Sequence, residues 1–155
     1  MKIWSGSASP EAGNDAYRVM LQKDIYVDRY LVPYEILSLM AYNLNIYRKG
    51  IGNRENTLKT LKELYDLYGR AINLDPDMED VHGNIEYLAI EETDGSAENM
   101  RMFLSRNEQV HTDVNFFLID ILLDYEKLIY STLQGIPNHI QEAVPSSHLK
   151  YYLSY

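Results

Sequence analysis

Apolar residues recur at steps of three and four along most of the chain, the period of a helix with one buried face. An early helix is expected to start at the Ser-Pro pair at 9–10. The next ends at the Lys-Gly pair at 49–50 and accommodates Pro33 only if it begins near that residue. Its predicted stripe is Val27, Tyr30, Leu31, Tyr34, Leu37, Ser38 and Ala41. A third helix, capped by Asn53, has its stripe at Leu58, Leu61, Tyr65, Tyr68 and Ile72.

The second half of the chain has the same helical period. "NLDPDMED" separates the third helix from a shorter one over "EDVHGNIEYLAIEE", which "TDGS" ends. The longest predicted helix runs from about Asn107 to about Gln134, where "QGIPN" is expected to stop it. Its apolar stripe is Val110, Val114, Phe117, Ile121, Tyr125, Leu128 and Thr132. A last helix follows Pro145, and no segment has the period of a strand, so we expect an all-α fold.

Composition narrows the classes of function. The chain has 155 residues, 46% of them hydrophobic and 24% charged, which suits a globular domain. A formal net charge of -9 without any basic cluster argues against nucleic acid and anionic membrane surfaces as partners. The lack of cysteine excludes disulfides, thiolate catalysis and Cys-ligated zinc. Neither a signal peptide nor a membrane-spanning run is evident, so we expect a cytoplasmic protein.

Three polar clusters lie at the boundaries of the predicted helices. They are "EDVHGNIE", which contains His82, "SRNEQ" at 105–109, and "PNHIQ", which contains His139. The four histidines lie far apart in the sequence, and no two of them stand at helical spacing, so no metal site is predicted. Each cluster alone is also explained as a helix cap or a surface turn, with Ser105 and Asn107 as ordinary N-cap residues.

Taken in order, five segments resemble the N-terminal part of argininosuccinate lyase, in the fumarase/aspartase superfamily. "MKIWSG" is similar to the family's Lys-Leu-Trp-Gly-Gly, and "DIYVDRYL" to Ser-Ile-x-x-Asp-Arg-x-Leu. "EDVHGNIE" is similar to Glu-Asp-Ile-His-x-Asn-Ile-Glu, and "SRNEQVHTD" to Ser-Arg-Asn-Asp-Gln-Val-x-Thr-Asp. "HIQEAVP" is similar to the loop Thr-His-Leu-Gln-x-Ala-Gln-Pro. The matches cover essentially the whole chain, and "SRNEQ" and "HIQ" are the most specific.

The resemblance implies an architecture. It implies a small helical N-terminal lyase domain over residues 1–105, followed over residues 106–155 by the first long helix of a central helical bundle. The long helix found from periodicity agrees with this division. No cofactor is expected.

The resemblance also implies carbon–nitrogen lyase activity, the reversible cleavage of argininosuccinate to arginine and fumarate in arginine biosynthesis. In that family a base removes a proton beside a carboxylate, and an acid protonates the departing guanidinium. Fixed donors aimed at the substrate carboxylates stabilise the charge that develops, which would explain Ser, Arg and Asn in succession at 105–107. By the match, His139 is catalytic. Substrate-binding roles fall on Ser105, Arg106, Asn107, Asn138, Gln141, Asp24 and His82.

The chain departs from the family pattern at three places. Asp24 stands where the family has a substrate-binding Ser, and Asn138 where it has a Thr. "RMFL" at 101–104 replaces His-Thr-Gly-Arg. An anion at position 24 can accept from a guanidinium but cannot donate to a carboxylate, so activity depends on whether these changes are tolerated.

The resemblance further implies a homotetramer in which each active site draws on three subunits. The family's Gly-Ser-Ser-x-Met-Pro-x-Lys loop, with its catalytic Ser, is not found in this sequence, so we expect the chain by itself to be inactive. The long helix would hold Asn107 and His139 roughly 40 Å apart, and its apolar stripe is expected to support a homo-oligomer. The alternative is a non-catalytic helical interaction module derived from the lyase family. "SRNEQ" argues against a sister lyase that acts on another succinylated amine.

Overall fold

The computed structural model describes residues 25–78 and 80–143, and it describes side chains in the last helix as far as residue 136. Within these residues the main elements are all helices: α2 (Val32–Arg48), α3 (Arg54–Tyr68), α4 (Val81–Glu92) and α5 (Arg106–Ala143). Short 3-10 turns precede α2 and α4, at Arg29–Leu31 and Pro76–Met78. The described part of the chain contains no strand, which confirms the predicted all-α class. The helices predicted near 9–22 and after Pro145 lie outside the described residues.

The chain divides into two compact units, and the division falls inside α5, between Phe117 and Leu118. The first unit contains α2, α3, α4 and the beginning of α5, and the second contains the rest of α5. The predicted domain boundary near Ser105 stays a prediction. Among the described helices, none is both long enough and apolar enough to cross a membrane.

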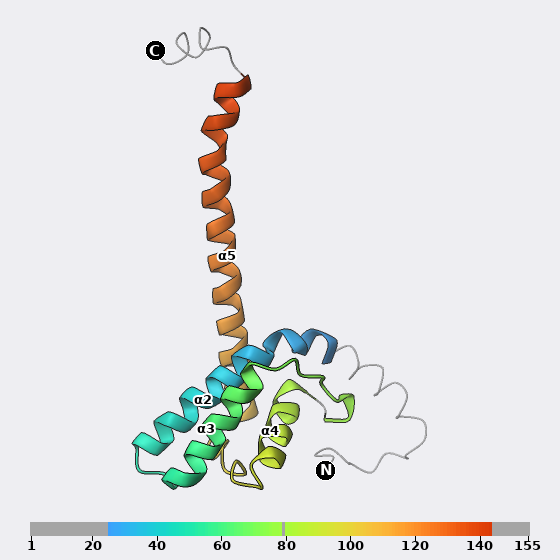
Figure 1. The fold of residues 1–155 in the computed structure, drawn as a ribbon, viewed down its shortest axis with the longest axis vertical. Coiled ribbons are helices and arrows are strands. Elements are labelled where there is room, and N and C mark those ends of the chain that lie inside the picture. Colours follow the sequence, from blue (N-terminus) through green and yellow to red (C-terminus); the bar gives the residue numbers. More distant parts are fainter. Residues whose placement is uncertain (1–24, 79, 144–155) are drawn as a thin grey trace, which may run out of the picture. The chain divides into compact units, whose positions relative to one another are not determined.

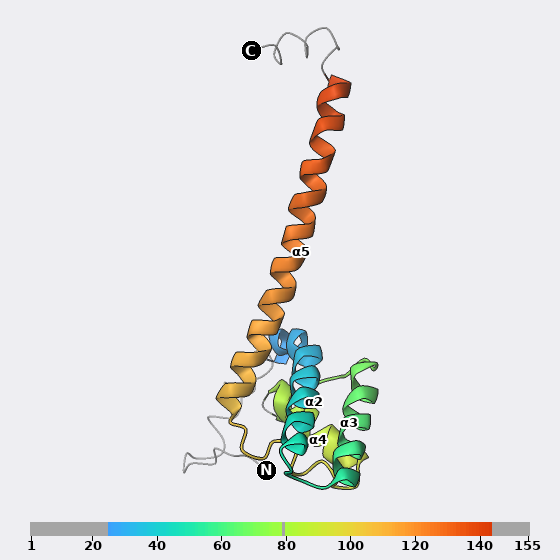
Figure 2. The ribbon, with the colours of Figure 1, turned by 90° about the vertical axis from the view of Figure 1, so that its left-hand side faces the viewer.

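The core of the first unit lies between α2, α3 and α4, which run side by side in both views (Figures 1 and 2). Each fully buried Leu or Ile side chain contributes about 1.5–3 kcal/mol to folding. Some of the buried apolar residues lie in the segment that connects α4 to α5. They are Ile36, Leu39, Leu64, Leu67, Val81, Ile85, Ala89, Ala97 and Met100.

Local signals place the starts of these helices. Pro33 lies in the first turn of α2, as predicted, where its missing N–H costs no helical hydrogen bond. Asn53 caps α3, since its Oδ1 accepts from the Asn56 N–H at 2.8 Å, which confirms that prediction. Asp80 caps α4 by accepting from the Gly83 N–H at 2.6 Å.

The predicted apolar stripe of α2 is right only in part, since Leu31 packs against the core and Tyr34 and Ser38 are half-buried. Val27, Tyr30 and Leu37 are exposed, while the buried stripe of the helix is Glu35, Ile36, Leu39 and Asn43. The error arose because two of these four buried residues are polar. A pattern that counts only apolar residues therefore shifts the stripe onto its neighbours.

The predicted stripe of α3 is also right only in part, since Ile72 packs against the core and Leu61 is half-buried. Leu58, Tyr65 and Tyr68 are exposed, and Thr60, Leu64 and Leu67 are buried. The helix ends at Tyr68, so Ile72 lies beyond it. Tyrosine counts as apolar in a periodicity search, yet its hydroxyl favours a position that reaches water.

The predicted end of the long helix is also wrong. It begins at Arg106, one residue before the predicted start, but it continues through Pro137 to Ala143 rather than stopping near Gln134. A proline inside a helix removes one backbone hydrogen bond and introduces a kink without necessarily ending the helix. The backbone of His139 therefore lies within α5.

Candidate functional site

The beginning of α5 is the part of that helix attached to the first unit, and it carries the "SRNEQ" segment. Ser105 and Glu108 form a reciprocal cap: the Glu108 N–H donates to Ser105 Oγ (3.3 Å), and the Ser105 N–H donates to a Glu108 carboxylate oxygen (2.9 Å). These hydrogen bonds lower the pKa of Glu108. Two polar residues of the segment are thus explained by helix capping, as the sequence allowed.

Arg106 connects the start of α5 to the start of α4. Its Nε lies 3.2 Å from Asp80 Oδ2, and its Nη1 donates to Gln109 Oε1 at 3.3 Å. Asp80 is the residue that caps α4. The half-buried guanidinium therefore holds the two helix starts together, whereas Asn107 is exposed and makes no such link.

A cluster of buried polar side chains lies where α2, α4 and α5 meet. Glu35 of α2, His82 of α4 and Asp113 of α5 are each at most 2% exposed. His82 Nδ1 lies 2.9 Å from Glu35 Oε2 and 3.5 Å from Asp113 Oδ2. We refer to these three residues as the buried triad.

Two neighbouring side chains hold the outer oxygens of the two carboxyl groups. Gln109 Nε2 donates to Glu35 Oε1, and Ser38 Oγ donates to Asp113 Oδ1, both at 2.8 Å. Gln109 is itself buried. The triad therefore fixes the first two turns of α5 against α2, and with them the position of "SRNEQ".

Burial controls the protonation of the triad. Desolvation and the adjacent Glu35 carboxyl raise the pKa of Asp113 to about 8. Desolvation also raises the pKa of Glu35, while a hydrogen bond with Asp113 and the charge of Arg106 act to lower it. Desolvation lowers the pKa of His82, against the opposing charges of Asp80 and Asp113. Near neutral pH the triad therefore has a neutral imidazole and a protonated Asp113.

The sequence-predicted site residues fall into three groups in the structure. Ser105, Arg106 and Asn107 lie together at the start of α5, two of them exposed and the third half-buried. His82 lies apart from the surface, inside the buried triad. Asp24 is outside the described residues, and the side chains of Asn138, His139 and Gln141 are outside them as well. The substrate-binding and catalytic roles of all eight stay predictions.

Sequence reasoning did not single out Glu35, Gln109 and Asp113 as partners of His82. All three carry polar groups on the buried face of a helix, and that face is known only from the structure. A buried carboxylate requires a partner, so such a position points to a polar network. Which residues would be the partners could not be read from the spacing.

The "RMFL" segment at 101–104 is held by its own contacts. Arg101 forms an ion pair with Glu86 of α4 at 2.7 Å, and the Met102 carbonyl accepts a hydrogen bond from the Tyr42 hydroxyl. Phe103 adopts a positive φ of 67° and is 80% exposed. A non-glycine residue in this conformation is strained, so the turn into α5 depends on the contacts of its neighbours.

Comparison with known proteins identifies argininosuccinate lyases as relatives of this chain. The argininosuccinate lyase of Rhodococcoides fascians is 29% identical over 150 residues, which cover 92% of this chain and 29% of the relative. The argininosuccinate lyase of Bacteroides fragilis is 26% identical over 164 residues, covering 94% of this chain and 36% of the relative. That of Methanocaldococcus jannaschii is 27% identical over 146 residues, covering 83% and 30%.

No protein-family model and no solved structure matches the chain. The match to the curated relatives extends over nearly the whole chain, but the chain spans only about a third of their length, between 29% and 36% for the first two. This chain is therefore related to a part of argininosuccinate lyase, a carbon–nitrogen lyase.

Proposed function

We propose that this chain is the N-terminal part of an argininosuccinate lyase, which cleaves argininosuccinate to arginine and fumarate. The observation that carries the proposal is the start of α5, where "SRNEQ" is fixed by a capping box, an ion pair and a buried amide. The relation to argininosuccinate lyases supports the same assignment.

The start of a helix suits the recognition of a dicarboxylate. Its free N–H groups and the positive end of its dipole favour an anion, and Asn107 adds an exposed amide donor. Arg106 adds a positive charge whose position Asp80 fixes. In this proposal Asn107 contacts a substrate carboxylate, while Ser105 and Arg106 keep the first turn of α5 in place.

The remaining roles in this proposal follow from the sequence resemblance. His139 is the general acid or base, with Asn138 and Gln141 beside it on the substrate. The complete enzyme is a homotetramer, and its sites combine segments of several subunits. No cofactor takes part in the reaction.

A chimaera tests the proposal. The corresponding part of the Bacteroides fragilis lyase is replaced by this chain, and fumarate formation is followed by its ultraviolet absorbance. Replacing Asn107 by Ala should lower kcat/KM by about 10–100-fold, the loss expected for one hydrogen bond to a charged group. Asn115→Ala, an exposed amide two turns further along α5, is the matched control and should keep the parent activity.

Binding to the chain itself gives an independent measurement. Argininosuccinate is added to the 15N-labelled chain. The backbone amide NMR signals of residues 106 and 107 should shift by more than that of the control residue Asn115. An assembled chimaera that keeps full activity with Asn107→Ala would contradict the assignment of this residue. Shifts that are the same at all three amides would contradict substrate binding at the start of α5.

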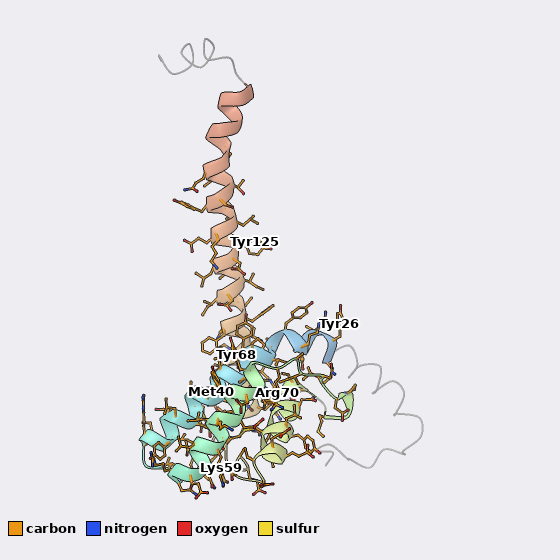
Figure 3. All side chains as sticks on the ribbon, in the orientation of Figure 1. Tyr26, Met40, Lys59, Tyr68, Arg70 and Tyr125 are labelled. Atoms are coloured by element: carbon orange, nitrogen blue, oxygen red, sulfur yellow. The ribbon has the colours of Figure 1, made fainter. Side chains whose placement is uncertain are left out.

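A second candidate function is a non-catalytic helical interaction module. The observation that favours it is the number of large apolar side chains exposed on the second unit, among them Tyr125 (Figure 3). The others include Leu118, Ile119, Leu122, Leu123, Leu128, Ile129, Leu133 and Ile136. An assembled chimaera without lyase activity, together with a chain that oligomerises through α5, would favour the module over the enzyme.

A further inference from the structure

The buried triad is a set of metal-ligand side chains that the packing of three helices assembles. One carboxylate oxygen of Glu35, one of Asp113 and one ring nitrogen of His82 lie within 4.8 Å of one another. Each residue comes from a different helix, α2, α4 or α5, and all three are buried. A cluster of this kind differs from an exposed acidic patch because water cannot satisfy its charges.

The three facing atoms have no hydrogen-bond partner of acceptable geometry. Glu35 Oε2, His82 Nδ1 and Asp113 Oδ2 are inaccessible to water and unpaired in this sense. The other carboxylate oxygens, by contrast, accept from Gln109 and Ser38. The outer atoms are thus oriented by a second layer of donors, and the inner atoms lie close to one another, which is the arrangement that supports metal ligands.

The spacing of the facing atoms fits a small divalent ion. Zn²⁺ binds imidazole nitrogen and carboxylate oxygen at about 2.0–2.2 Å, so neighbouring ligand atoms are about 3.0 Å apart in octahedral and about 3.4 Å apart in tetrahedral geometry. The observed separations from His82 Nδ1 are 2.9 Å to Glu35 and 3.5 Å to Asp113. An ion at the centre would therefore need only small movements of the side chains.

Charge balance supports the same occupant. Two carboxylates and a neutral imidazole carry two negative charges, which one divalent ion cancels. The positive charge of Arg106 acts on Glu35 from outside the triad, but its Nε pairs with Asp80. Without a metal ion, the proton on Asp113 relieves the repulsion between the two carboxyl groups.

We propose that Glu35, His82 and Asp113 form a binding site for a divalent transition-metal ion of the Zn²⁺ type. Imidazole nitrogen together with carboxylate oxygen selects this class over Mg²⁺, which prefers an all-oxygen shell that keeps several waters. The ion joins α2 and α4 to the first turns of α5 and so stabilises the first unit. Because the site is buried, the ion enters when the start of α5 detaches or during folding.

The test measures zinc retained by the chain. The full chain is unfolded in chelator, refolded with Zn²⁺ or with Mg²⁺, separated by gel filtration and analysed for bound metal and Tm. We expect roughly one Zn²⁺ per chain, a raised Tm with Zn²⁺ and neither effect with Mg²⁺. His82→Asn and Asp113→Asn should each weaken zinc binding by at least about ten-fold, since even a change beside a metal ligand costs this much.

His111→Asn is the matched control, because His111 lies exposed on the same helix as Asp113, where it contacts Asn115. This variant should retain zinc like the parent. Circular dichroism of each metal-free variant identifies any that fails to fold, and Asp113→Asn preserves the shape of a protonated aspartic acid. Zinc retention that is absent in the parent, or unchanged in folded Asp113→Asn, overturns the proposal and leaves the triad with a proton only.

Discussion

Raising the pH should destabilise the metal-free chain through Asp113. Burial beside Glu35 raises the pKa of Asp113 from 3.8 to about 8, so the folded chain holds a proton that the unfolded chain has already released. Between these two pKa values unfolding releases the proton of Asp113, so the free energy of unfolding falls as the pH rises towards the folded pKa. Between about pH 6.5 and about pH 8, linkage gives a loss of about 1.6 kcal/mol.

His82 sets the lower limit of this pH window. Burial lowers the pKa of the folded His82 below 6.5. As the pH falls towards 6.5, His82 therefore takes up a proton in the unfolded chain before it does so in the folded chain. This effect has the opposite sign and offsets that of Asp113 at lower pH. Comparing the parent with Asp113→Asn at each pH cancels the contribution of the surface charges, and the window lies at or above pH 6.5, where the contribution of His82 is small.

The assay is urea unfolding followed by circular dichroism, in chelator, at half-unit steps across the window. We expect the stability of the parent relative to Asp113→Asn to fall by about 1–2 kcal/mol from the lowest to the highest pH. Asp124→Asn, an exposed carboxyl on the same helix, controls for the loss of one carboxyl group. A difference between parent and Asp113→Asn that is constant, or that rises with pH, would refute the raised pKa and its cause.

Three further outcomes are expected. Ser105→Ala should destabilise the first unit by about 0.5–2 kcal/mol in urea, because it removes the side-chain cap of α5; an unchanged midpoint would show that the cap contributes nothing. Gly83→Ala should cost about 1–3 kcal/mol in the same assay, since the added Cβ would meet the Met78 carbonyl oxygen at 2.6 Å; equal stability would show that the turn before α4 adjusts freely. Light scattering should find an oligomer that Leu122→Glu dissociates and Lys127→Glu, at a polar exposed position, leaves intact; a strict monomer at every concentration would contradict association through α5.

The sequence predicted the features that depend on neighbouring residues. The all-α class, the cap at Asn53, the position of Pro33 in a first turn and the start of the long helix are confirmed. These follow from hydrogen bonds and backbone angles within one turn, which local residue types determine. The order of motifs also predicted the relation to argininosuccinate lyase, which the curated relatives confirm for part of that enzyme.

Only the tertiary structure decided which face of each helix is buried and which polar residues meet. Glu35, His82 and Asp113 come from three helices, and no spacing along the chain indicated their contact. The α2 stripe was displaced because a buried Glu35 counts as polar in a periodicity search, although its partners Gln109 and His82 make its burial tolerable. The free energy of a buried charge depends on partners far apart in sequence, so it is fixed by how the helices pack and not by the local pattern.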